Sequence, residues 1–239
     1  MTVVVIAAVA VMVELGFWQL RRLHSVRDDN ARVGARLALP AAPLDELLAA
    51  GVDPSNATFR RVRVGGRYDR VTEVVLANRS FEGTPGTDLL TPLVTANGRA
   101  LIVDRGWVPL DESGAQEEKA RPPATPVTVT GVLFPSERKT VFAPSIPPTG
   151  RLTTIPRVDV ARIEKQLPYP AYPLYLRLES QTPAQAELPV PPGLPDLSEG
   201  PHLSYAVQWF IFATIAAAVY VAVLRRTVRS GRGAAKDET

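Results

Sequence analysis

The sequence contains no cysteine and only two histidines, His24 and His202. Without cysteine there is no disulfide scaffold, thiolate metal site, thiol nucleophile or attached c-type haem. Two histidines are too few for a three-histidine zinc site. With 239 residues the chain is long enough for one ordinary domain, which must be stable through its core alone.

The chain also has little excess of charge of either sign, because its formal net charge is only +3. Residues 225–239 hold five basic and two acidic residues, so the excess lies in a short tail. Nucleic-acid binding needs a basic face on a folded domain. We therefore expect no nucleic-acid partner.

The two ends of the chain lack proline, since all 23 prolines lie between Pro40 and Pro201. Residues 2–20 are apolar apart from Glu14, and residues 203–224 carry no charge. As helices these runs span about 28 and 33 Å, close to the thickness of a bilayer core. They predict two transmembrane helices, and the first has neither the basic start nor the cleavage site of a signal peptide.

The basic residues around the two predicted spans give opposite orientations. The basic tail after the second span favours a cytoplasmic C-terminus, whereas Arg21 and Arg22 after the first span would place the central region in the cytoplasm. We give the second span more weight because its apolar run is cleaner, and a basic segment upstream of Met1 would restore the balance. We expect a multi-pass protein of the cell membrane with both termini cytoplasmic and an extracytoplasmic central domain.

The central region is rich in short strand patterns. Strands are predicted at 58–68, 72–79, 89–95, 100–108, 127–134 and 173–179, with an Asn97-Gly98 hairpin turn. Short helices are predicted at 43–50 and 158–167. The expected fold is two transmembrane α-helices flanking a mainly antiparallel β (α+β) domain, curled into a barrel or sandwich. The predicted parts are span 1–20, domain 21–180, proline-rich connector 181–201, span 202–224 and basic tail 225–239.

No catalytic motif is present in the sequence, so we expect a protein that is not an enzyme. His202 stands at the entrance of the second span, with Tyr205 and Trp209 on the same helical face. These residues suit an axial haem ligand beside aromatic cover. By their spacing alone they are more typical of an ordinary membrane interface, where histidine, tyrosine and tryptophan are common.

Motifs at both ends of the chain resemble those of the surfeit locus protein 1 family, the assembly factors of cytochrome c oxidase. Leu-Gly-Phe-Trp-Gln-Leu-Arg at 15–21 and His-Leu-Ser-Tyr-Ala-Val-Gln-Trp-Phe at 202–210 are similar to two family signatures. Between them the family order is matched at 59–68, 78–79, 91–93 and 103–109, the last including Arg105-Gly106-Trp107. The resemblance covers nearly the whole chain.

The resemblance implies a protein without known catalytic activity that supplies haem a to subunit I of a haem-copper oxidase. It implies that His202 binds the haem, transiently, as an axial ligand of the iron. Antiparallel spans would bring Trp18 and Gln19 to the same membrane face as His202, so we expect them to complete the site with Tyr205 and Trp209. The alternative is a membrane-anchored scaffold that stabilises oxidase or other respiratory-complex subunits without haem, through residues such as Arg105 and Trp107. A haem-modifying enzyme would need more than one titratable group in the membrane.

Overall fold

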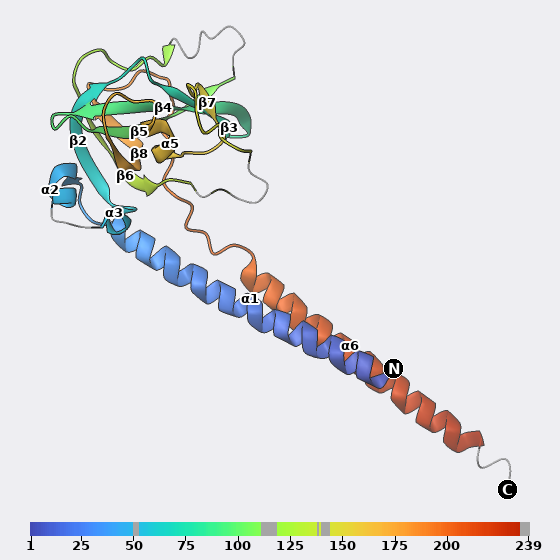
Figure 1. Cartoon of the computed structure of the whole chain (residues 1–239). Coiled ribbons are helices and arrows are strands. Elements are labelled where there is room, and N and C mark those ends of the chain that lie inside the picture. Colours follow the sequence, from blue (N-terminus) through green and yellow to red (C-terminus); the bar gives the residue numbers. More distant parts are fainter. Residues whose placement is uncertain (50–52, 111–118, 138, 140–143, 235–239) are drawn as a thin grey trace. The chain divides into compact units, whose positions relative to one another are not determined.

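The computed structural model describes residues 1–49, 53–110, 119–137, 139 and 144–234 (Figure 1). They form two compact units. The helical unit holds residues 1–34 and 196–239, and the β unit holds residues 35–195.

Two long helices, α1 (Thr2–Leu37) and α6 (His202–Ala234), make up the helical unit. They run antiparallel, because Gln19 hydrogen-bonds to His202 and Tyr220 to Thr2. These two contacts are separated by 17 residues of α1 and 18 of α6, or about 26 Å along each helix axis. The helices therefore stay paired over the thickness of a bilayer core.

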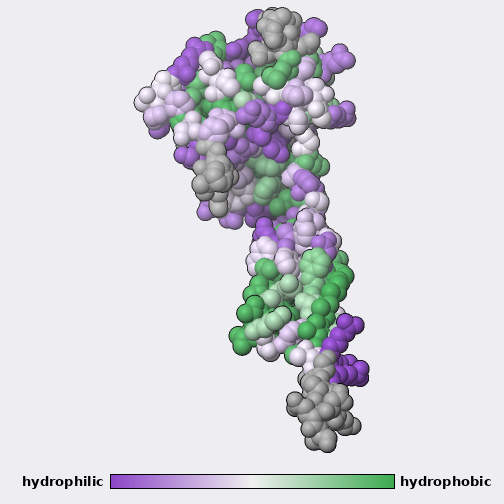
Figure 2. Space-filling view, turned by 90° about the vertical axis from the view of Figure 1, so that its right-hand side faces the viewer, coloured by the Kyte–Doolittle hydropathy of each residue, from purple (hydrophilic) through white to green (hydrophobic). Residues whose placement is uncertain are grey.

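The apolar surface of both helices faces outward. Only 6% of the most apolar 18-residue window of each helix is buried, and Figure 2 shows hydrophobic side chains covering this region. A core helix of a soluble protein would be mostly buried instead. By length and composition the two helices are suited to anchor the chain in a membrane.

Helix α1 continues 17 residues beyond the predicted end of the first span at residue 20. The reason is visible in the sequence, because no proline occurs before Pro40. Small residues form the seam with α6: Gly16, Ala206 and Ala213 are buried. A Cβ on Gly16 would lie 2.7 Å from the Phe210 ring, so only glycine permits this approach.

The β unit is a closed barrel. The strand order is β1-β2-β6-β8-β5-β4-β3-β7, and an additional pairing of β2 with β4 closes the five strands β2-β6-β8-β5-β4 into a ring. Its elements are β1 (Ala42–Pro43), α2 (Leu44–Ala49), α3 (Pro54–Ala57), β2 (Arg61–Tyr68), β3 (Val74–Phe81), β4 (Thr84–Thr95), β5 (Ala100–Pro109), β6 (Val127–Pro135), β7 (Thr154–Ile155), α5 (Val160–Glu164) and β8 (Ala171–Thr182).

The predicted fold class is confirmed, with one addition: the sheet is mixed. Most ladders are antiparallel, but β5 and β8 pair in parallel. Strand side chains alternate between the two faces of a sheet, so the barrel interior receives Leu93, Leu101, Val103 and Leu176. The hairpin predicted at Asn97-Gly98 joins β4 to β5, with Gly98 at a φ of 76°.

The segment after β8 returns along β5 before it reaches the helical unit. Val190 forms a bridge with Trp107, in which each backbone N–H donates to the other's carbonyl at 2.8 Å. Proline prevents a longer ladder here, since Pro189, Pro191 and Pro192 flank the bridge. The connector predicted as extended is thus held against the barrel by this bridge and by a hydrogen bond of 3.4 Å from Gln185 to the Arg105 carbonyl oxygen.

Candidate functional site

His202 is the first residue of α6, and its imidazole contacts α1. Its Nδ1 lies 2.8 Å from Oε1 of Gln19, which comes from a position 183 residues earlier in the chain. Both side chains are half-buried. The structure therefore brings together two residues from opposite ends of the chain.

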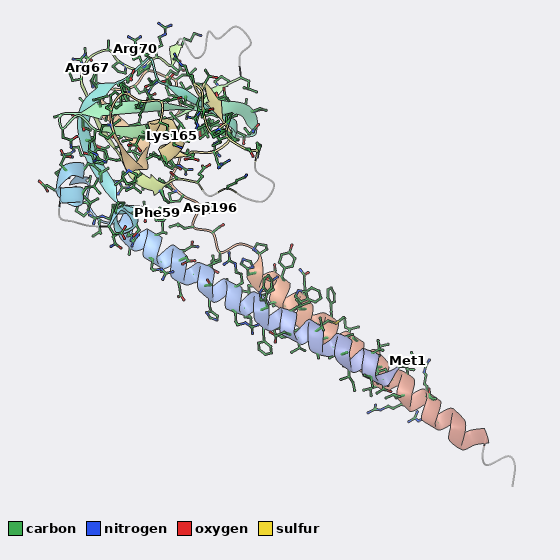
Figure 3. The ribbon with its side chains drawn as sticks, viewed as in Figure 1. Met1, Phe59, Arg67, Arg70, Lys165 and Asp196 are labelled. Carbon is green, nitrogen blue, oxygen red and sulfur yellow. The ribbon has the colours of Figure 1, made fainter. Side chains whose placement is uncertain are left out.

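Contacts just before α6 fix the position of His202. The Arg27 guanidinium donates two hydrogen bonds of 2.8 Å to the Glu199 carboxylate. Asn30 donates to the carbonyl oxygen of Leu197 at 2.7 Å. The ion pair raises the pKa of Arg27 and lowers that of Glu199, since each charge stabilises the other. These contacts hold the return segment, which begins at Asp196 (Figure 3), against α1.

The helix pair has two sides that carry different residues. On one side Gln19 meets His202, and on the other the Phe17 and Phe210 rings meet edge to face at 5.3 Å between centroids. Residues three, four or seven apart share a helix face. We call the first side the His202 face; its members are Gln19, Arg22, His202, Tyr205 and Trp209, and Trp18 lies beside it at the neighbouring position of α1.

Aromatic surface on and beside the His202 face is open to the surroundings. Trp18 is 50% exposed and Tyr205 is 46% exposed, and Trp209 lies edge to face with Phe212 at 6.1 Å. The rings that sequence reasoning selected around His202 therefore remain available to a ligand. Rings of this kind suit a flat apolar ligand.

The residues present fit an axially bound haem. Nδ1 of His202 is occupied by Gln19, and no hydrogen bond to Nε2 is found within the described part of the chain. Gly200 lies next to the ring with no side chain: even a Cβ there would be 3.8 Å from Nε2. One imidazole nitrogen is thus anchored and the other is accessible, as in a metal-binding histidine.

Arg105 lies inside the barrel, where 0% of its surface is exposed. Its guanidinium contacts Glu73 Oε2 at 3.3 Å, donates to the carbonyl oxygen of Ala120 at 2.7 Å and lies over the Tyr68 ring. A buried guanidinium requires such partners. Any contact of this segment with another protein would therefore use its neighbours and not the Arg105 side chain.

Trp107 lies on β5, and its side chain is half-buried. Its ring lies against Gly86, where a Cβ would be 2.1 Å from Nε1, and 5.6 Å from the Phe81 ring. Gly106 before it has a φ of 119°, and a Cβ there would lie 1.9 Å from the Val190 carbonyl oxygen. In this Arg-Gly-Trp sequence, Arg105 thus forms a buried ion pair, Gly106 lies against the Val190 backbone and Trp107 presents a partly exposed ring.

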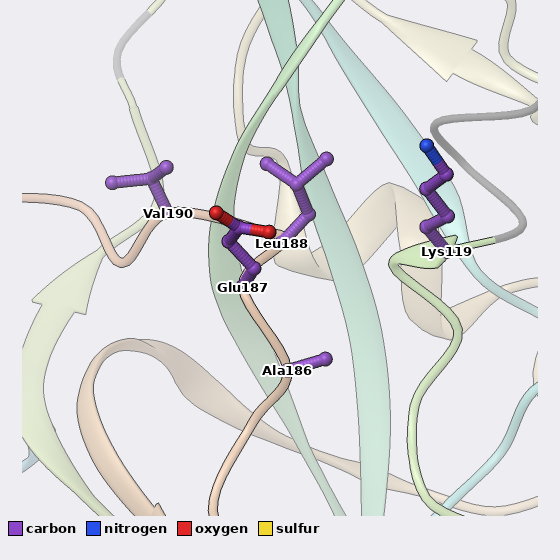
Figure 4. Close-up of a pocket in the computed structure, with 5 residues that line it drawn as sticks. All are labelled: Lys119, Ala186, Glu187, Leu188 and Val190. Carbon is purple, nitrogen blue, oxygen red and sulfur yellow. The ribbon is translucent and has the colours of Figure 1, made fainter.

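A cavity of about 590 Å³ lies beside this segment (Figure 4). Its described lining consists of Lys119, Ala186, Glu187, Leu188 and Val190. Lys119 and Glu187 are the ionisable groups in that lining. The cavity therefore offers an apolar wall with one group of each sign.

Sequence reasoning missed a row of charges on the outer face of the barrel. Asp104 on β5 lies 3.9 Å from Arg177 on β8, and Arg79 on β3 contacts Asp88 at 3.5 Å and Glu137 at 2.9 Å. The five residues lie on separate strands or just beyond one, so only strand pairing brings them together. Burial, together with the nearby Asp88 carboxylate, raises the pKa of Asp104 to about 7.

The chain matches the SURF1 family over residues 6–214. It is 27% identical to a SURF1-like protein of Mycobacterium bovis over 200 residues, which cover 83% of this chain and 72% of that protein. It is 24% identical to a SURF1-like protein of Rickettsia felis over 239 residues, covering 95% and 97%. A SURF1-like protein of Monosiga brevicollis is 24% identical over 223 residues, covering 89% and 83%.

The family match runs from residue 6 in α1 through the barrel to residue 214 in α6. The resemblance found in the end motifs thus extends over the whole architecture. The chain belongs to the SURF1 family, a family of oxidase assembly factors.

Proposed function

We propose that the protein binds haem a at the His202 face and assists its insertion into subunit I of a haem-copper cytochrome c oxidase. The observation that carries this proposal is the 2.8 Å hydrogen bond between His202 Nδ1 and Gln19 Oε1. An amide oxygen can only accept, so Nδ1 is the donor in this contact, and in the neutral imidazole Nε2 then keeps its lone pair. This is the tautomer that an axial haem ligand needs.

The residues around His202 have distinct tasks in this proposal. Haem supplies an iron that takes an axial nitrogen and a flat apolar ring that needs shielding from water. Trp18, Tyr205 and Trp209 provide that apolar cover, while Gln19 orients the imidazole. A single protein ligand on an open helix face permits release, which a carrier requires.

The proposed membrane topology agrees with this task. With both termini in the cytoplasm, the helix ends that bear Gln19 and His202 lie at the outer surface of the membrane. There the site would meet the membrane-embedded subunit I directly. The lipid bilayer would cover the remaining apolar surface of the helices.

The proposal is tested by purifying the protein from cells that synthesise haem a and recording its visible and pyridine hemochrome spectra, beside His202→Ala. We expect haem a in the native protein and a loss in the variant. His24→Ala is the matched control, because His24 is exposed and removed from Gln19 by more than one helical turn. Haem in neither the native protein nor the control would contradict the proposal.

A scaffold that holds oxidase subunits without binding haem is the second candidate. The observation in its favour is the partly exposed Trp107 ring near the 590 Å³ cavity of the barrel. This function predicts that His202→Gln keeps full oxidase assembly while Trp107→Ala impairs it. The haem-carrier proposal predicts the opposite order of severity.

A further inference from the structure

We infer that Arg22 is the carboxylate-binding residue of the His202 face and holds a propionate of the haem. This inference rests on the proposed function and assigns a role to a residue that its argument did not use. Haem has an apolar ring with two propionate carboxylates on one edge, and a carrier must accommodate both kinds of surface. The axial ligand and the aromatic residues account for the ring only.

The arginines of α1 differ in their partners. Arg21 pairs with Glu14, Arg27 with Glu199 and Arg32 with Asp29, and Arg36 donates to Thr58. Arg22 is exposed and has no hydrogen bond or ion pair with any residue that the structure describes. Its five N–H donors are therefore free for an oxyanion.

Arg22 also lies on the correct side of the helix pair. It is three residues from Gln19 and four from Trp18, so one helical turn separates it from each. Arg21 projects to the other side, where it pairs with Glu14 near Phe17. The free arginine, and not the paired one, shares the His202 face.

The order of groups along the membrane normal matches the polarity of haem. Arg22 lies about 4.5 Å farther along α1 than Gln19, toward the end of the predicted span. Tyr205 and Trp209 lie deeper along α6 than His202. A haem ligated by His202 would thus place its apolar edge over the aromatic rings and its propionates near Arg22 and water.

A lipid phosphate is the other oxyanion that reaches this depth, because arginine side chains extend to the headgroup region. The two sources of oxyanion predict different effects of esterifying the haem and of changing the lipid. A propionate contact disappears when the haem carboxylates are esterified. A phosphate contact depends on the lipid and is indifferent to esterification.

The test titrates the full-length protein in phosphatidylcholine nanodiscs with haem and with haem dimethyl ester, following the Soret band. For Arg22→Gln we expect haem to bind about tenfold more weakly, the usual size of one charge-assisted hydrogen bond. Binding of the dimethyl ester should be unchanged by the substitution. Arg21→Gln is the matched control, and it should leave the affinity for both compounds unchanged.

Each other outcome overturns the inference. An equal loss for both compounds in Arg22→Gln would show a structural role, and no loss for either would show no role. Phosphatidylcholine also carries a phosphate, so a loss that is equal for both compounds and larger in phosphatidylglycerol discs would assign Arg22 to the lipid headgroup. If the native protein binds neither compound, or if His202→Ala binds both as tightly as the native protein does, the proposed function itself fails. The Arg22→Gln results described above overturn only the inference, because they leave haem binding by the native protein and its dependence on His202 intact.

Discussion

In each unit the chemical properties of one side chain depend on the residues that contact it. On the barrel, Asp104 is a carboxylic acid with 1% of its surface exposed, beside the Asp88 carboxylate and within reach of Arg177. In the helical unit, His202 has one nitrogen held by Gln19 and the other free. Both groups have properties that their amino-acid types alone do not give.

The buried Asp104 predicts an unusual dependence of stability on pH. Its pKa is about 7 in the folded protein, against an ordinary value of 3.8. The folded state therefore holds the proton more tightly, so the free energy of unfolding falls as pH rises from about 4 to 7 and is constant above. Urea unfolding at several pH values should show this fall. The free energy of unfolding of Asp104→Asn should change less with pH, and at pH 8 it should exceed that of the native protein by about 1–3 kcal/mol.

Two results would contradict this prediction. If the native protein is equally stable at pH 5 and pH 8, or if Asp104→Asn keeps the full slope, Asp104 is ionised throughout. Arg177 and Arg79, which oppose the effect of burial, would then dominate. Asp104→Asn should otherwise differ little from the native protein at pH 4.

Gln19 is expected to control the haem affinity of His202 without contacting iron. Gln19→Leu removes the acceptor for Nδ1–H, and loss of such a partner typically lowers metal affinity by about 10- to 100-fold. Gln19→Glu keeps an acceptor and should retain most of the affinity. Soret titrations of both variants measure this, and equal losses in the two would show that the effect is one of packing and not of the hydrogen bond.

At the scale of elements, the proline-rich connector approaches β5 most closely at one glycine. Gly106 has a φ of 119° and meets the carbonyl oxygen of Val190 where a Cβ would stand. The paired hydrogen bonds of Trp107 and Val190 depend on this approach. The connector is thus positioned by a backbone contact that few sequences permit.

Gly106→Ala should detach this segment from the barrel. We expect a destabilisation of about 2–4 kcal/mol, because alanine both strains the backbone and displaces Val190. Gly65→Ala on β2 is the matched control, since a Cβ there meets nothing within 4 Å. Thermal unfolding and limited proteolysis near residue 190 check the effect, and equal behaviour of the two variants would refute it.

On the scale of the whole molecule, the two units have different sources of stability. The barrel closes on itself and has its own core, which includes Leu93, Leu101, Val103 and Leu176. The helices bury little of their apolar windows and depend on lipid and on each other. The units should therefore be separable.

A fragment of residues 35–195 is expected to fold in water as a monomer without either helix. Closure of the barrel leaves no long central strand unpaired, which limits edge-to-edge association. Circular dichroism, gel filtration and a cooperative urea transition measure this. An aggregated fragment, or one without a transition, would show that the barrel needs the helical unit.

The proposed orientation of the chain can be tested directly. The basic tail after α6 predicts a C-terminus in the cytoplasm and a barrel outside it. A fluorescent protein at residue 239 should therefore fluoresce, and alkaline phosphatase placed after residue 40 should be active. The reverse pattern would mean that Arg21, Arg22 and Arg27 after the first span set the orientation.

Local and periodic patterns of residues are sufficient to predict most elements of this protein. The two apolar runs, most strands and the Asn97-Gly98 turn follow from the spacing of apolar residues and from glycine conformation. The short elements β1, β7 and α3 were not predicted, because two to four residues carry too weak a pattern. His202 and Gln19 were selected through their motifs, and two antiparallel spans already predicted that these residues could meet.

Most contacts between distant residues, in contrast, depend on how the chain folds in three dimensions. The parallel pairing of β5 with β8, the burial of Arg105 on Glu73 and the charge row around Asp104 each join segments far apart in sequence. For Gln19 and His202, which are 183 residues apart, the sequence predicted that they could meet, and the structure adds which atoms form the bond. Such contacts arise from chain closure and helix packing, which no local pattern of residues encodes.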